Sequence, residues 1–283
     1  MERTLYIDGL GLWTPALPGW ATARAALRGE TPAAADPAPG PGTPVRRPAP
    51  ALLGANERRR APDTVLLALE VASQALAGSG HDAAGLASVF ASAHGDLPTT
   101  DALCRTLAAD PQALSPTRFH HSVHNAASGY WAIASGSHAA STALAAGEHS
   151  FGAGLLEAAT QCAADGAPVL LVALDTEACG ALASANRSRG QLALALLLAP
   201  RRSGASHWAL RWWLQPAADR HEEPPASAAA RALAANAMAP ALPLFEALAG
   251  GRPARRTLPL SASTRLELQL EPLAAALAPA AAA

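Results

Sequence analysis

The chain has 283 residues, half of them hydrophobic, and its 21 basic residues, all arginine, nearly balance 22 acidic ones. This length suits one large domain or two small ones, and the balanced charge argues against a nucleic-acid-binding or anionic-membrane surface. No signal peptide, membrane-spanning run, zinc-site spacing or disulfide framework is evident, so we expect a soluble cytoplasmic protein without a bound metal or cofactor.

The first part of the sequence predicts a strand followed by two helices. A buried strand is expected over residues 4–12, where glycines permit close backbone approach, and a short helix over residues 20–27. Residues 30–57, rich in proline, alanine and glycine, are expected to form a long surface loop. Asp63 is predicted to cap the next helix, whose apolar face extends from Val65 to Leu76.

The remaining pattern predicts an α/β domain with helices on both faces of a sheet. Further strands are expected over residues 86–93, 140–144, 168–174, 191–198, 208–214 and 264–270. Further helices are expected over residues 101–109, 125–136 and 147–164, and an Ala-rich helical stretch over residues 227–248, interrupted at Pro240 and Pro243. We divide the chain into residues 1–214, a shortened extension of the same domain over residues 215–273, and an Ala-rich tail over residues 274–283 that is expected to fray.

Four segments, in chain order, resemble a β-ketoacyl synthase. They are IDGLGLWTP with Trp20 and LRGE, the 58–80 helix with the 86–95 strand, SPTRFHHSVHNAASGYWAI at 115–133, and STALAAGEHSFGAGLLEAA at 141–159. The resemblance covers roughly residues 1–199 and implies a thiolase-like layered α/β fold. It identifies residues 1–214 with the N-terminal half of such enzymes and leaves the C-terminal part shortened and degenerate.

The fourth segment is similar to the one that carries the nucleophilic cysteine, which reads approximately T-A-C-A-(S/T)-G-x-H-A-I-G in active enzymes. The matching residues are Thr142, Ala143, Ala145, Gly147, His149 and Gly152, but Leu144 occupies the cysteine position. Leucine has no nucleophilic atom, so no acyl-thioester can form there. Active relatives also carry two histidines, or a histidine and an asparagine, in glycine-rich loops of their second half, whereas the only histidine of this chain after Leu214 is His221, which lacks such a context. Both losses predict a protein without condensing activity.

The resemblance is therefore to chain-length-factor-like partners of ketosynthases, of the type found with aryl polyene and related pigment synthases. It implies a heterodimer with an active β-ketoacyl synthase, which itself binds the acyl carrier protein, and a shared sheet formed through the strand at residues 140–144. It also implies that this chain helps to shape the partner's acyl pocket. The candidate interface and pocket residues are Ser122, Val123, His124, Asn125, Ala140, Ser141, Thr142, Ala143 and Leu144.

Several residues in these segments have simpler interpretations. His120, His121 and His124 lack nearby cysteine or carboxylate ligands, which makes interface or ordinary loop histidines better readings than a metal site. Asn125 is also a candidate side-chain cap for the helix that follows it. Cys162 is expected to be a buried apolar residue rather than a displaced nucleophile.

Two rival functions remain open from the sequence. One is a thiolase-fold acyltransferase or hydrolase with a relocated nucleophile, such as Cys162, a serine or a histidine. The other is a homo-oligomeric structural or regulatory protein. Covalent acylation of the isolated chain would favour the first, and a gene neighbourhood without an intact ketosynthase would favour the second.

Overall fold

The structure, a computed structural model, describes residues 3–31, 46–185, 187–217 and 223–274. His221 and nearly all of the predicted tail lie outside the described residues, as does half of the predicted loop at 30–57. None of the described helices combines the length and the apolar character that crossing a bilayer requires.

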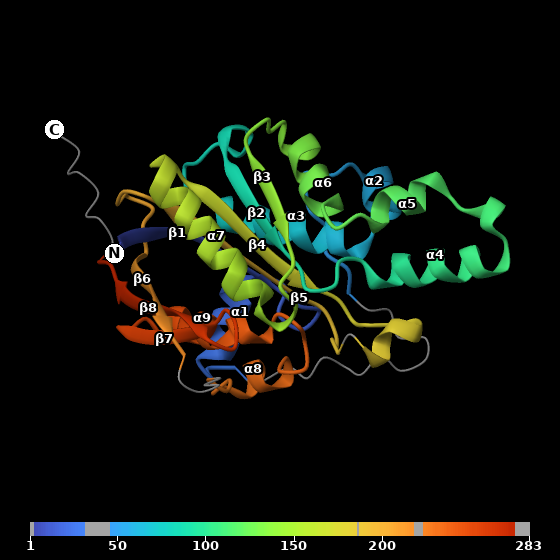
Figure 1. The fold of residues 1–283 in the computed structure, drawn as a ribbon. Helices are drawn as coiled ribbons and strands as arrows, with labels where there is room; N and C mark the ends of the chain where they lie inside the picture. Colours follow the sequence, from blue (N-terminus) through green and yellow to red (C-terminus); the bar gives the residue numbers. More distant parts are fainter. Residues whose placement is uncertain (1–2, 32–45, 186, 218–222, 275–283) are drawn as a thin grey trace.

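Within the described residues, eight strands form one mixed sheet in the order β3-β2-β4-β5-β1-β6-β8-β7 (Figure 1). Strands β2, β3 and β4 are parallel to one another, and the remaining neighbours are antiparallel. The strands are β1 (Arg3–Trp13), β2 (Ala87–Ala91), β3 (Ser141–Leu144), β4 (Val169–Asp175), β5 (Leu192–Ala199), β6 (Trp208–Pro216), β7 (Ala254–Pro259) and β8 (Thr264–Pro272).

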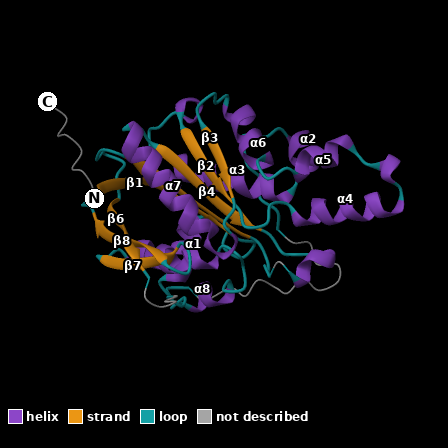
Figure 2. Ribbon diagram, in the orientation of Figure 1, coloured by secondary structure: helices purple, strands orange, loops and turns teal. Residues whose placement is uncertain are grey.

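Helices cover both faces of the central strands, as Figure 2 shows. The α-helices are α1 (Trp20–Leu27), α2 (Ala55–Arg60), α3 (Asp63–Leu76), α4 (Leu97–Ala109), α5 (Pro116–Ser122), α6 (Ala126–Ser135), α7 (Ser150–Asp165), α8 (Ala228–Ala232) and α9 (Leu242–Gly250). Short 3-10 turns are η1 (Ala83–Gly85), η2 (Pro111–Ala113), η3 (Gly147–His149), η4 (Gly180–Ser184) and η5 (Ala239–Ala241).

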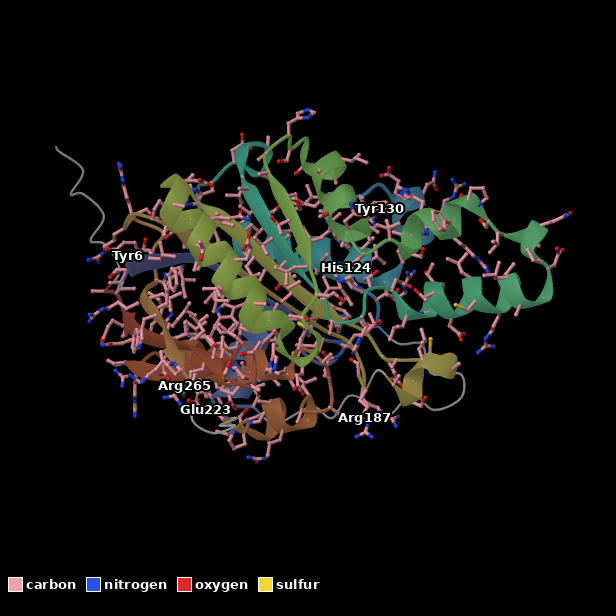
Figure 3. All side chains as sticks on the ribbon, viewed as in Figure 1. Tyr6, His124, Tyr130, Arg187, Glu223 and Arg265 are labelled. Carbon is pink, nitrogen blue, oxygen red and sulfur yellow. The ribbon has the colours of Figure 1, made fainter. Side chains whose placement is uncertain are left out.

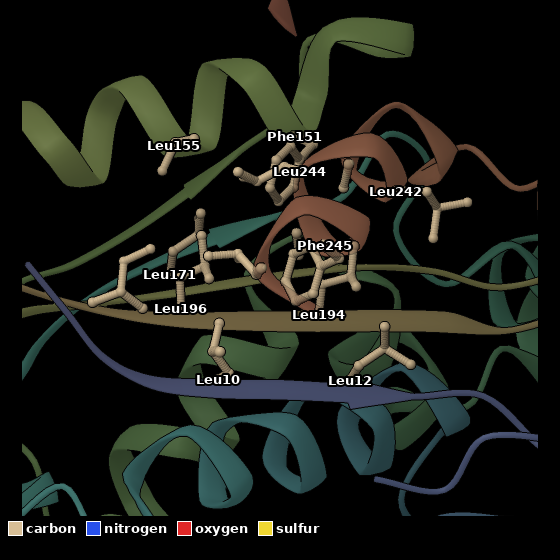
Figure 4. Close-up of a cluster of buried hydrophobic side chains, with 14 of the residues drawn as sticks. Leu10, Leu12, Phe151, Leu155, Leu171, Leu194, Leu196, Leu242, Leu244 and Phe245 are labelled. Carbon is tan, nitrogen blue, oxygen red and sulfur yellow. The ribbon is translucent and has the colours of Figure 1, made fainter. Parts of the chain in front are cut away.

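The core has two parts, one on each face of the sheet. Helices α1, α7 and α9 pack on one face, where Phe151 and Phe245 lie against leucines of β1, β4 and β5 (Figure 4). Helix α3 packs on the other face with Trp131 of α6. Because both faces are covered, every residue of β4 and β5 is buried, which explains their uninterrupted apolar sequences.

The glycines of β1 allow the close approach of α3 that the sequence suggests. A Cβ atom on Gly9 would lie 1.7 Å from the carbonyl oxygen of Ala75, and one on Gly11 would lie 2.3 Å from that of Val71. These distances are below any van der Waals contact, so only glycine fits at either position.

Several local predictions need correction. Asp63 does not cap α3, because it is the first helical residue and Pro62 precedes it without a side-chain cap. Pro243 does not interrupt a helix but lies in the first turn of α9, where proline is tolerated. Helix α5 and strand β7 were not predicted from the sequence.

Candidate functional site

The turn after β3 is built as a rigid connection into α7. Gly147 adopts φ +56°, in the left-handed region, at the start of η3. The Ser150 hydroxyl is buried, donates to the Gly147 carbonyl oxygen (2.7 Å) and accepts from the Ala146 amide (2.9 Å). Leu144 is the last residue of β3, and its half-buried side chain packs against the core. The predicted nucleophile position therefore has an ordered turn but no nucleophilic atom.

The hydroxyl groups near Leu144 form hydrogen bonds with other side chains. Ser141 accepts a hydrogen bond from the Ser88 hydroxyl (3.0 Å), and Thr142 accepts one from the Gln161 amide (3.0 Å). The imidazole Nδ1 of His149 is buried without a hydrogen-bond partner among the described residues. Neither hydroxyl is thus bonded to the imidazole base that activation requires.

The thiol of Cys162 is equally unsuited to nucleophilic attack. It lies buried on α7, and burial, with a smaller contribution from the Asp8 carboxylate, raises its pKa to about 12. A thiol with this pKa stays protonated at neutral pH, and only the thiolate is an effective nucleophile.

Strand β3 is an open edge of the sheet. It pairs with β2 on one side only, from Ser88–Ser141 to Ala91–Leu144. Ala140 and Ser141 are exposed, whereas Thr142, Ala143 and Leu144 are half-buried. The predicted strand residues therefore lie together at one accessible edge.

The other predicted residues follow α5, on the same side of the molecule. Ser122 ends α5 and donates to the Phe119 carbonyl oxygen (2.8 Å), while Val123, His124 and Asn125 are exposed. Asn125 makes no side-chain cap to α6. Its φ of −90° and ψ of 12° depart from the extended conformation of a capping residue, so the cap prediction is wrong.

Ser92 connects the two groups of predicted residues. Its amide donates to the Leu144 carbonyl oxygen (3.2 Å), and its own carbonyl oxygen accepts from His124 Nε2 (2.9 Å). Figure 3 shows His124 beside the carboxyl ends of the central strands. The structure thus joins the turn after β3 to the loop at residues 123–125 through a residue that sequence reasoning missed.

Two of the three histidines of this segment form hydrogen bonds with different partners. His121 is buried and shares a hydrogen bond with the Tyr130 hydroxyl (2.9 Å), whereas His124 bonds to Ser92. Burial and then the adjacent His120 lower the pKa of His121, and burial raises that of Tyr130. No group of three or more His, Cys, Asp or Glu residues in the described part of the chain could hold a metal ion.

Exposed apolar side chains surround these segments. Ile133 on α6 is 81% exposed and Phe119 on α5 is 65% exposed. Leu107 on α4 and Leu114 in the following loop are also exposed. Sequence reasoning did not single out these residues, because nothing in the sequence shows which side of a short helix lacks a covering layer.

A cleft of about 1340 Å³ lies at the carboxyl ends of the central strands. His94, His149, Arg187 and Glu223 are among the residues that line it, and Figure 3 labels the last two. Ligands of open α/β sheets bind at this end of the strands, where neighbouring connections diverge. Alanine and proline form much of the cleft wall.

The layered α/β fold and the strand–turn–helix connection at Leu144 define a ketosynthase-type domain. The family model described as "Beta-ketoacyl synthase, N-terminal domain" matches residues 32–250, and the chain belongs to this family. The fold is the thiolase-like layered fold of that domain, as the sequence predicts. A search of curated proteins found no match.

Three solved structures of related complexes are similar in fold. A chain of the ketosynthase ApeO in complex with its chain length factor ApeC, from Xenorhabdus doucetiae, is 22% identical at a TM-score of 0.68, covering 94% of this chain and 99% of that chain. A chain of AntDE:AntF, a type II acyl carrier protein with its hexaketide-bound ketosynthase, is 11% identical (TM-score 0.69; coverage 95% and 99%). A chain of the ishigamide ketosynthase/chain length factor is 16% identical (TM-score 0.66; coverage 96% and 100%).

Proposed function

We propose that this protein is a non-catalytic, chain-length-factor-like partner of an active β-ketoacyl synthase. One observation carries the proposal: Leu144 occupies the position that matches the nucleophile of active relatives, before a turn that the hydrogen bonds of Ser150 hold in place. An ordered turn without the atom that takes the acyl chain is the arrangement expected of a non-catalytic partner. The buried, protonated Cys162 offers no substitute.

The two edges of the sheet support a heterodimer formed through β3. At the β7 edge, Arg255 is exposed and Pro259 cannot donate to a new strand, and both features discourage strand addition. Strand β3, with the sequence STAL, has no charge, proline or bulge. An unprotected edge in contact with α6, which carries the exposed Ile133, is typical of a surface that a partner covers.

The role of this surface is to complete the active site of the partner. In the heterodimer, Ser122 to Asn125 and the end of β3 form part of the wall of the partner's acyl chamber, and the chamber's length limits how many two-carbon units fit. The partner, rather than this chain, binds the acyl carrier protein and carries out condensation. The similarity to chains of ketosynthase and chain-length-factor complexes supports this assignment, and we place it in polyene biosynthesis of the aryl polyene or a related pigment type, in the cytoplasm.

Co-expression with a full-length ketosynthase of the same organism tests the proposal. Size-exclusion chromatography with light scattering is expected to show a one-to-one complex, and the complex is expected to extend acyl chains on the carrier protein. Replacing Cys104, Cys162 and Cys179 together with serine should leave extension intact, whereas replacing the partner's nucleophile should abolish it.

Two outcomes would overturn the proposal. Acylation or thioester hydrolysis by the isolated chain would indicate an enzyme with a relocated nucleophile. A stable homo-oligomer that neither binds the ketosynthase nor alters its product lengths would indicate a structural or regulatory protein.

A further inference from the structure

Asp175, the last residue of β4, is a fully buried carboxylate without an ion-pair partner among the described residues. It accepts hydrogen bonds from the Ser92 hydroxyl (2.8 Å), the Ala93 amide (2.8 Å) and the His94 amide (3.2 Å). Burial raises the pKa of this carboxyl, and the hydrogen bonds oppose that change. Burying a carboxylate costs free energy, which hydrogen bonds to the carboxylate offset, so the segment that supplies these bonds is the place to look for the role of Asp175.

That segment, residues 92–94, connects the parts of the candidate site. The side chain of Ser92 is fixed by Asp175 and also accepts from the Gly95 amide (2.8 Å). The backbone of Ser92 bonds to Leu144 on one side and to His124 on the other. The exposed loop and the turn after β3 therefore share one buried anchor.

The anchor also extends to the C-terminal part of the chain. Asn236 is 4% exposed, and its side-chain amide donates to the carbonyl oxygens of Asp175 (3.2 Å) and Arg189 (3.1 Å). The Arg189 amide in turn donates to the Ala235 carbonyl oxygen (3.0 Å). The end of β4 is thus hydrogen-bonded both to residues 92–94 and to Asn236.

We infer that Asp175 and Ser92 are positioning residues that hold the loop at 123–125 and the turn at Leu144 in the geometry that the partner ketosynthase binds. This inference rests on the proposed function. A surface held in its bound shape before association avoids the ordering cost of binding. The same bonds set the position of the chamber wall, so loosening them is expected to broaden the distribution of product lengths.

Asp8 supplies a matched control for Asp175. It is also a buried carboxylate, and it accepts from Ser206 (2.6 Å), Ser203 (3.1 Å) and His81 (2.9 Å). Leu198 of β5 pairs both with Ile7 and with Val169, the first residue of β4. Asp8 therefore lies about 20 Å from Asp175 along the strands, at roughly 3.3 Å per residue.

The experiment compares Asp175→Asn with Asp8→Asn. Both variants lose a buried carboxylate and are expected to lower the Tm, but only Asp175→Asn is expected to weaken the heterodimer, by about tenfold in Kd. Asp175→Asn should also speed amide hydrogen exchange in residues 92–95, 123–125 and 144–147 and broaden the product lengths. Ser92→Ala, which removes one hydroxyl, repeats the comparison if Asp175→Asn does not fold.

The outcomes separate this inference from the proposed function. Equal losses of affinity in the Asp175 and Asp8 variants would overturn it, because a general loss of stability would then explain both. Unchanged exchange at residues 123–125 in the isolated Asp175→Asn chain would also overturn it, whether or not any ketosynthase binds. If the wild-type chain binds no ketosynthase, the proposed function fails, and the exchange comparison still decides whether the anchor holds the loop.

Discussion

Replacing Ile133 with alanine tests the proposed interface at its most exposed apolar side chain. Ile133 lies on α6, next to the open strand β3, and is 81% exposed in the isolated chain. The substitution removes three carbon atoms, each worth about 0.8 kcal/mol when buried. Scaled by the exposed fraction, burial against the partner contributes about 2 kcal/mol, which corresponds to roughly a 30-fold increase in Kd for Ile133→Ala.

The Ile133→Ala substitution should weaken binding without lowering the stability of the isolated chain. An exposed isoleucine makes few contacts, and alanine has the higher helix propensity, so the Tm should stay the same or rise slightly. Fluorescence titration with the labelled ketosynthase gives the Kd, and thermal unfolding gives the Tm. Leu214→Ala is the matched control, because Leu214 is 52% exposed on β6, far from β3 in the strand order. A Kd for Ile133→Ala within twofold of wild type, or equal effects of both variants, would refute the interface.

Three further predictions concern the chain itself. Iodoacetamide at about pH 8 should label exposed Cys104 but not Cys162, whose pKa is raised to about 12, and mass spectrometry that finds Cys162 alkylated in folded protein would contradict this. Burial lowers the pKa of His121 in the folded chain. Below about pH 6.5 the imidazole therefore binds a proton more readily in the unfolded chain than in the folded one, so the free energy of unfolding should fall on acidification. Thermal unfolding between about pH 8 and pH 5 should show a shallower decline for His121→Gln, and identical profiles would argue against it. Gly9→Ala should destabilise the fold by about 3 kcal/mol or more, since its Cβ would overlap the Ala75 carbonyl oxygen, and denaturant unfolding measures this loss.

The sequence predicts the sheet well where burial leaves a continuous pattern. Strands β4 and β5 are buried on both faces, so their apolar sequences identify them directly. Strand β7 was missed because ARRTLP, at an exposed edge, has no such pattern. Helix α5 was missed because its seven residues pack few apolar side chains and include an exposed phenylalanine.

The candidate site was predictable only as far as its motif. The match around Leu144 identifies the turn, but the anchor beneath it joins Ser92 to Asp175, which lie 83 positions apart in the sequence. This contact depends on β2 and β4 being neighbours, with Ala91 opposite Ala173. A buried acid held by backbone amides also has no sequence signature, because any chain segment can supply the donors.

Under the proposed function, residue 144 does not have to react with an acyl chain, which leaves this position open to leucine. A residue that reacts must expose its reactive atom, and such sites are usually less stable than they could be. Under that function the same position is free to pack, and the half-buried side chain of Leu144 lies against the core that α7 and β4 share. The Ser150 bonds and the Ser92 anchor hold the end of β3 at the edge of the sheet. A leucine in an ordered turn is therefore consistent with the proposed function, in which assembly needs the shape of this region and only bond-making needs a nucleophilic atom.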